Sequence, residues 1–474
     1  MLLTEEPVRK AGSFRDPSGF VFELQGRIFR AVDQDCLDTV YQLRDDGLLD
    51  RLAEEGLIVR TELVEDPSLQ ERLSDAYPGY PGFLEHQQIS PISYPYEWSA
   101  TMLADAGVLT LDLQMRLLTH GYSLKDATAY NIQFPNGQPV FIDIPSIIRP
   151  GRLDLWIALG QFNRMFTLPL VLNQAKGQSL RAYFLAHLDG STIAEVRRAF
   201  GRLELLKPGL LLDVTLPYLL ERFATNGNGV AAPLAEKGTG RAEVQLVNLR
   251  RLRAKLQRLA RCHKPDSLWT NYAATRNYTD QAQQSKAQAI REFLTEHVPS
   301  TVLDLGCNTG LYSMLAAECG ASVTAVDADC ESIDLLYRQI RNEPQPILPL
   351  CVDLANPSPA IGFCNRERES FLDRINVDCV LALAVIHHLH VTANLPVAGI
   401  RDLFADLTRR FCVLEFVPTN DDMFRQLIKY RTDSFDRFTL ADCIEVFQER
   451  FALVRQVPVA DSPRTLLFWE KREA

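Results

Sequence analysis

The feature that most constrains the fold is the segment V-L-D-L-G-C-N-T-G at residues 302–310, in which an apolar run passes through an acid into a turn with two glycines. A second apolar run, at residues 323–326, ends in Asp327. Apolar runs of this length that end in an acid are typical of the parallel strands in a nucleoside-binding α/β unit. The pattern therefore predicts an α/β domain with a ligand site at the carboxyl ends of its strands.

The turn itself distinguishes between two kinds of nucleoside site. Gly306 and Gly310 permit a sharp bend, and Asn308 stands where a third glycine is expected but also tolerates a left-handed backbone. A dinucleotide site needs G-x-G-x-x-G, so that a pyrophosphate can sit on the helix N-terminus. Here Asp304 lies inside the motif, and its carboxylate would repel a pyrophosphate but suit the amino group of a methionine tail.

On these residues, the segment 303–310 resembles motif I of the class I methyltransferases that depend on S-adenosylmethionine (SAM). The resemblance continues through Asp327, through Asp353 after a third apolar run, and through residues 378–389, which contain a fourth. It implies that SAM is the cofactor, that Asp327 binds the ribose and that Asp353 reaches the adenine amino group. The resemblance assigns these residues to the cofactor site: Asp304, Gly306, Asn308, Gly310, Asp327, Asp353 and Ala384.

The order of the apolar runs agrees with this family. Strands are expected near residues 302–305, 323–327, 347–353, 378–384 and 411–416, with helices between them, as a parallel sheet requires. Two last strands, at 453–459 and 464–469, are separated by a short loop and predict an antiparallel hairpin. Such a hairpin closes the sheet in the class I methyltransferase fold. The fold class predicted for this half is therefore α/β, with a Rossmann-like sheet.

Composition limits what the rest of the chain can be. A chain of 474 residues is too long for one ordinary domain, and its net charge of −10 gives no general attraction to nucleic acid or to anionic membranes. The ten cysteines contain no C-x-x-C pair, which favours buried thiols in a reducing compartment. The N-terminus has acids in place of a basic signal region, and no apolar run approaches about 18 residues. We therefore expect a cytoplasmic protein with no membrane partner.

One joint stands out along the chain. Residues 225–240 are rich in glycine and small polar residues, and a helix is expected over 243–264. Residues 241–264 contain eight Lys or Arg and only one Glu. This helix is either packed across the joint with a solvated basic face or a contact for an anionic partner such as RNA or a phosphorylated glycan. The expected domains are residues 1–224, a linker and helix at 225–264, and a methyltransferase domain at 265–474.

The chemistry is expected from the loop after the fourth strand. Its sequence at 384–390 is A-V-I-H-H-L-H, where amino-directed methyltransferases of nucleic acids usually carry an N/D-P-P-aromatic element. His387 or His388 is a candidate base for a hydroxyl acceptor, although an imidazole there can also cap the backbone or line the methionine pocket. Positioning alone can also suffice for methyl transfer.

Two further groups near the same site have open roles. Glu415, Asp421 and Asp422 lie at the end of the fifth strand, either on the side where the acceptor enters or as a solvated rim. Residues 269, 272, 278 and Lys286 precede the first strand, either as a lid over the cofactor or as helix packing.

The N-terminal half carries a weaker pattern. Asp126 and Asn131 are five residues apart, and Asp143 follows a turn at residues 135–137, which resembles the catalytic loop and metal-binding acid of the protein-kinase-like fold. In that family the first Asp is the base and the other two side chains hold magnesium. The His-Arg, Phe-Gly and glycine-loop elements are absent, and arginine replaces the expected lysine in the segment 26–32. A degenerate, α+β kinase-like domain is predicted, in which Asn131 and Asp143 are the only metal candidates.

Taken whole, the chain resembles bacterial two-part proteins that include nodulation host-specificity proteins of the NoeA type, which implies a link to glycan or secondary-metabolite modification. The predicted function is a SAM-dependent methyltransferase that acts on an oxygen atom of a glycan or small molecule. A bifunctional or regulatory protein whose N-terminal half binds ATP and magnesium is one alternative. A non-catalytic SAM-binding scaffold is the other.

Overall fold

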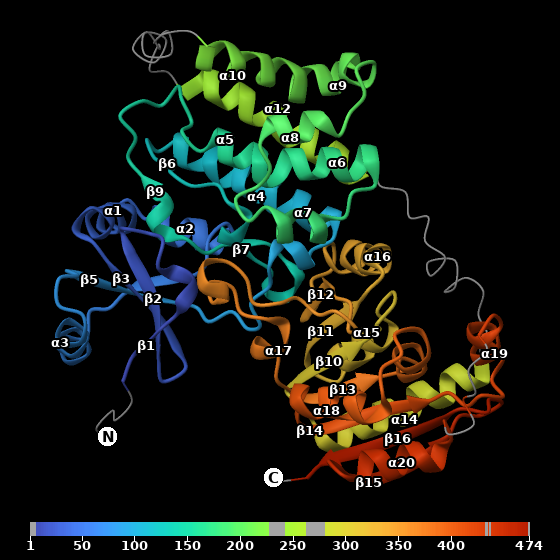
Figure 1. Cartoon of the computed structure of the whole chain (residues 1–474). Coiled ribbons are helices and arrows are strands. Elements are labelled where there is room, and N and C mark those ends of the chain that lie inside the picture. The colour runs from blue at the N-terminus through green and yellow to red at the C-terminus, as the bar shows by residue number, and fades with distance from the viewer. Residues whose placement is uncertain (1–5, 227–241, 262–279, 432–434, 436–437, 473–474) are drawn as a thin grey trace.

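The computed structural model describes residues 6–226, 242–261, 280–431, 435 and 438–472 (Figure 1). Its C-terminal half is built on a seven-stranded sheet with the order β12-β11-β10-β13-β14-β16-β15. The first five of these strands run parallel, and β16 pairs antiparallel with both β14 and β15. The strands are β10 (Thr301–Leu305), β11 (Ser322–Asp327), β12 (Ile347–Cys351), β13 (Val377–Ala382), β14 (Thr408–Phe416), β15 (Phe451–Pro458) and β16 (Thr465–Lys471).

The central strands are buried because helices cover the sheet. Four of the five residues of β10 and five of the six of β13 are buried, as expected for parallel strands covered on both faces. The helices of this half are α14 (Asp280–His297), α15 (Leu311–Glu318), α16 (Cys330–Ile340), α17 (Phe371–Arg374), α18 (Val397–Leu407), α19 (Asp422–Ile428) and α20 (Leu440–Gln448). The predicted α/β class and the closing antiparallel hairpin are both confirmed.

The N-terminal half begins with a five-stranded antiparallel sheet of order β1-β2-β3-β5-β4. A mostly helical part follows it along the chain. The strands are β1 (Val8–Arg9), β2 (Gly19–Leu24), β3 (Arg27–Val32), β4 (Thr61–Leu63), β5 (Gly82–His86), β6 (Ser123–Leu124), β7 (Ile132–Gln133), β8 (Val140–Phe141) and β9 (Ile147–Ile148). The helices are α1 (Gln34–Asp45), α2 (Leu48–Glu54), α3 (Pro67–Ala76), α4 (Ala100–Leu118), α5 (Leu159–Phe162), α6 (Leu168–Lys176), α7 (Leu180–Ala186), α8 (Ile193–Arg198), α9 (Pro208–Leu210), α10 (Leu216–Asn226) and α12 (Ala242–Arg261).

The predicted turn at residues 135–137 joins β7 to β8. These strands pair antiparallel, with Ile132 opposite Phe141. Asn136 and Gly137 take φ values of 51° and 70°, the left-handed conformation that these two residue types adopt most readily. The turn therefore brings Asp143 back towards Asn131.

Helix α12 is the predicted basic helix, and it packs on α4. Its inward face contains buried Leu249, Leu256 and Ala260, while Arg253 pairs with Asp112 of α4 at 2.6 Å. The structure therefore supports packing across the joint for this helix. Residues 227–241 and 262–264 and the aromatic residues at 269, 272 and 278 lie outside the described residues, and the boundaries near 224 and 265 stay a prediction.

The two halves share one buried apolar cluster that runs from α4 into the methyltransferase-like sheet. Helix α16 lies against α4, and Asp334 accepts hydrogen bonds from the backbone N–H and the hydroxyl of Thr101, both at 3.0 Å. Polar side chains of one half are thus satisfied by the other. No helix in the described part of the chain has the length and apolar character needed to cross a bilayer.

Candidate active site

The turn between β10 and α15 is held in a left-handed course. Gly306, Asn308 and Gly310 have φ values of 68°, 48° and 85°. A Cβ on Gly310 would lie 2.4 Å from a methyl carbon of Leu336, and one on Gly306 would lie 2.5 Å from a methyl carbon of Val385. The glycines are therefore required for both conformation and space, because the turn is wedged against α16 on one side and the loop after β13 on the other.

Asp304 lies at the base of this turn and is almost wholly buried. Its carboxylate accepts a hydrogen bond of 2.6 Å from the hydroxyl of Ser313. Burial raises the pKa of Asp304 to about 7, while the Ser313 hydrogen bond and the charge of Lys286 oppose the shift. A carboxyl group in this state would be stabilised as an anion by a ligand that brings an ammonium group.

The acids at the tips of the next two strands are more accessible. Asp327 is half-buried, and its two carboxylate oxygens accept the backbone N–H groups of Asn308 and Asp329 at 2.8 and 2.9 Å. These bonds orient the carboxylate beside the turn and leave further lone pairs for hydroxyl groups. Asp353 is exposed beyond β12, where its carboxylate accepts the N–H of Ala355 at 2.9 Å. The three acids therefore stand at the carboxyl ends of β10, β11 and β12 in spatial order.

The loop after β13 places a histidine pair beside this row. Ala384 has a left-handed φ of 56°, after which the chain turns so that His387 is buried and its ring centre lies 4.2 Å from that of His388. Nδ1 of His387 is buried and has no hydrogen-bond partner among the described residues. Burial lowers the pKa of both imidazoles, and nearby Arg464 lowers each further, so both are neutral near pH 7. His390 is directed elsewhere, with Nδ1 2.8 Å from the carbonyl of Leu395.

A buried charge cluster borders the histidines. Lys286 Nζ lies 2.6 Å from Glu415, and Arg464 forms two bonds, of 2.7 and 3.1 Å, with Asp421 and lies 3.7 Å from Glu415. The side chain of Glu415 is wholly buried, and those of Lys286 and Asp421 are nearly so. The interpretation of Glu415 and Asp421 as a solvated rim is therefore wrong, and only Asp422 is exposed. Arg464 was missed in the sequence, although its position just before the last strand could have indicated it.

Comparisons with known proteins identify the family to which the chain belongs. Residues 278–448 match the family model described as a methyltransferase domain. Over 473 residues, which are 98% of this chain and 97% of the relative, the sequence is 33% identical to the nodulation protein NoeA of Rhizobium meliloti (strain 1021). The chain belongs to the NoeA family of nodulation proteins. Its C-terminal half is a class I, SAM-dependent methyltransferase domain.

Two solved structures are also similar to parts of this NoeA-family chain. The N-methyltransferase NodS from Bradyrhizobium japonicum WM9 aligns over 44% of this chain and all of its own, with 13% identity and a TM-score of 0.32. The magnesium protoporphyrin IX methyltransferase from Synechocystis PCC 6803 aligns over 40% of this chain and 84% of its own, with 16% identity and a TM-score of 0.31.

The N-terminal half of this NoeA-family chain also brings its predicted residues together. Arg30 of β3 lies 2.8 Å from Asp143, and the side-chain amide of Asn131 donates to the same carboxylate at 3.3 Å. Burial and the charge of Asp143 raise the pKa of Asp126, which places that acid in the same cluster. No cluster of His, Cys, Asp or Glu able to hold a metal occurs in the part of the chain that the structure describes. The positive charge beside Asp143 is instead the guanidinium of Arg30.

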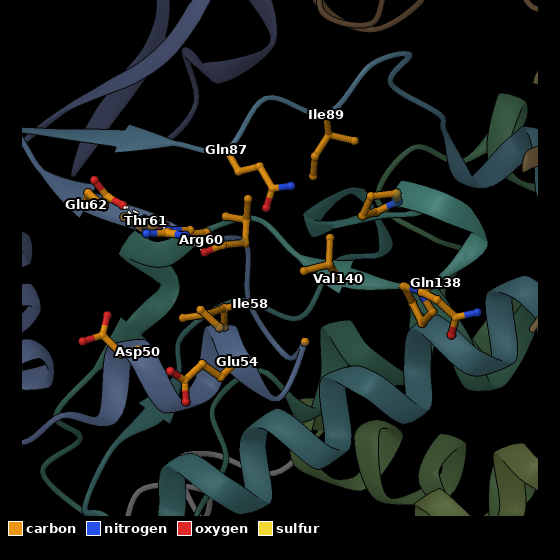
Figure 2. Close-up of a pocket in the computed structure, with 15 residues that line it drawn as sticks. Asp50, Glu54, Ile58, Arg60, Thr61, Glu62, Gln87, Ile89, Gln138 and Val140 are labelled. Atoms are coloured by element: carbon orange, nitrogen blue, oxygen red, sulfur yellow. Dashed lines mark hydrogen bonds and ion pairs between the residues drawn. The ribbon is translucent and has the colours of Figure 1, made fainter. Parts of the chain in front are cut away.

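A cavity of 620 Å³ lies elsewhere in the N-terminal half, between α2, β4 and the β7–β8 hairpin. Figure 2 shows Asp50 and Glu54 on one side of it and Val140 and Gln138 on the other. None of the residues predicted for the cofactor or for catalysis lines this cavity.

Proposed function

We propose that the C-terminal domain transfers a methyl group from SAM to an oxygen atom of a small-molecule or glycan acceptor, with His387 receiving the acceptor hydroxyl. The choice of oxygen as the methyl-accepting atom rests on one observation. Nδ1 of His387 is buried and lacks a hydrogen-bond partner among the described residues. A buried acceptor atom without a hydrogen bond is costly unless a ligand supplies the donor. A hydroxyl group at the methyl-transfer position would supply it.

The residues of the cofactor site fit SAM. Asp304 would pair with the amino group of the methionine part, Asp327 with the ribose hydroxyls and Asp353 with the adenine amino group. Gly306, Asn308, Gly310 and Ala384 would shape the backbone around the ligand, since all four have the left-handed conformation or close packing that brings main chain near a bound molecule. SAM supplies an electrophilic methyl group on a sulfonium.

The chain's own residues then orient the acceptor. The hydroxyl of the acceptor would donate to Nδ1 of His387, which directs an oxygen lone pair towards the methyl carbon. During methylation of the acceptor oxygen, the hydroxyl proton would become strongly acidic and would pass to the imidazole of His387, which its burial keeps neutral beforehand. Glu415 is a poorer base, because Lys286 and Arg464 hold its carboxylate between two cations.

The test uses the full-length protein and SAM carrying a radiolabelled methyl group. We expect the protein to bind SAM in calorimetry and to transfer label into a glycan or metabolite fraction of an extract that lacks the gene. His387→Ala should keep SAM affinity within about threefold and lower the transfer rate at least about a hundredfold. His390→Ala is the matched control and should keep both, because His390 bonds to Leu395. Unchanged transfer by His387→Ala would overturn the role of this residue.

A second candidate function rests on the N-terminal cluster. Arg30, Asp126, Asn131 and Asp143 lie together, and this charged cluster, in which Arg30 supplies the positive charge beside Asp143, supports ATP as a ligand of this half. Calorimetry with ATP and magnesium on the wild type and on Asp143→Asn would decide between this function and a half that only holds the acceptor. SAM binding without turnover on any extract would instead favour the scaffold alternative.

A further inference from the structure

An apolar stripe faces solvent along the helix that ends in α10. Leu212, Leu216, Leu219 and Leu220 are 46, 42, 37 and 69% exposed. Their spacing of four, seven and eight residues places them on one side of a continuous helical segment, while Val214 on the other side is fully buried. A stripe of this kind normally faces a protein core. Here it faces outwards.

Helix α12 extends this surface. Lys255 of α12 lies 2.6 Å from Asp213, which places α12 beside the start of the leucine-bearing helix, and the two helices lie together at the top of the molecule in Figure 1. Val244 and Val247 of α12 are 55 and 64% exposed. The two apolar groups thus lie on neighbouring helices, and we name them together the leucine surface, defined as Leu212, Leu216, Leu219, Leu220, Val244 and Val247.

The elements that carry the leucine surface also carry exposed cationic side chains, which we call its basic rim. The exposed cations on these elements and on the turn before them include Arg202, Lys207, Arg250, Arg251 and Arg258. The exposed acids of the same segments are Glu221 and Glu243. The excess of cations is local, because the whole chain has a net charge of −10. The expectation from net charge therefore does not describe this surface.

We infer that the leucine surface and its basic rim dock on an anionic lipid bilayer. Apolar side chains on a helix that lies flat can enter the boundary between head groups and acyl chains, while Lys and Arg around them attract anionic lipids. A second copy of the chain fits less well, because two such surfaces in contact would bring basic rims together. A nucleic acid would leave the leucines unused. Docking of this kind needs no spanning helix.

The test is flotation of the full-length protein with vesicles of phosphatidylcholine alone and with vesicles containing roughly 30% phosphatidylglycerol. We expect binding only to the anionic vesicles and weaker binding when salt rises from about 0.1 to about 0.5 M. The variants Leu216→Ser/Leu220→Ser and Arg251→Gln/Arg258→Gln should each weaken binding at least about tenfold. Leu372→Ser, at a leucine of α17 that is as exposed as Leu216, is the control and should bind as the wild type does.

Three results would overturn the inference. They are failure of the wild type to float with anionic vesicles, equal loss of binding in Leu372→Ser, and a concentration-dependent dimer that Leu216→Ser/Leu220→Ser abolishes without any effect on flotation. The last result would identify the surface as a contact between two copies. Thermal melting of each variant, which should match the wild type because the changed side chains are exposed, distinguishes lost docking from lost folding.

Discussion

At the scale of single residues, Asp304 connects binding of the methyl donor to pH. Burial raises the pKa of its carboxyl to about 7, and the proposed ammonium partner stabilises only the ionised form. SAM binding should therefore weaken as pH falls below 7, approaching about tenfold per pH unit. Calorimetric titration between about pH 5 and 7 measures this slope. Asp304→Asn should bind weakly at every pH with a flatter profile, and an unchanged slope would rule out Asp304 as its source.

His387 and Asp304 differ in how far the sequence could predict them. The row of acids after apolar runs, and the glycines between them, follow from local pattern, because a strand, a tight turn and a helix each have a sequence signal. The neutral state of the histidine pair does not follow from local pattern. The neutral form of His387 results from burial, from His388 beside it and from Arg464, which is 77 residues further along the chain and next to the site only in the folded structure.

At the scale of elements, the sheet was predictable and its charge cluster was not. Each strand carries its own apolar run, and the closing hairpin has its own loop signal. The pairing of β14 with β16 sets Glu415 opposite Leu466 and Phe416 opposite Thr465, which brings Arg464 to the end of β14. Charged side chains after a strand usually indicate a solvated rim. Only the register shows that Glu415 and Asp421 are buried and paired.

The contact between α4 and α16 should contribute to the stability of the folded chain. Asp334 of α16 accepts the backbone N–H and hydroxyl of Thr101 in the first turn of α4, and it also pairs with Arg338 at 2.8 Å. Asp334→Ala leaves buried donors without an acceptor and should lower the free energy of unfolding by about 2–4 kcal/mol. Urea denaturation measures the change. Gln339→Ala, at an exposed position of α16, is the control and should stay within about 0.5 kcal/mol of the wild type.

At the scale of the whole molecule, the halves are joined by buried polar contacts as well as by a shared apolar cluster. Arg374 of α17 pairs with Glu97 and donates to the carbonyl of Ile92, and its guanidinium lies 4.7 Å from the ring centre of Tyr94. Glu97 is wholly buried, and only 3% of the Arg374 side chain is exposed. The sequence predicts two halves. The contact between Arg374 and Glu97, however, joins positions 277 residues apart and is known only from the folded structure.

Removal of Arg374 should therefore act on the cooperativity of the whole chain. Arg374→Ala leaves the Glu97 carboxylate buried without its partner, which costs about 3–5 kcal/mol. Because the lost contact joins the halves, the single calorimetric transition expected of the wild type should move to lower temperature and broaden or split in the variant. Arg374→Met combined with Glu97→Gln removes both charges and should recover most of the lost stability, since the penalty comes mainly from the uncompensated buried carboxylate. Equal destabilisation in the single and double variants would show that packing of the guanidinium against Tyr94, and not the ion pair, holds the halves together.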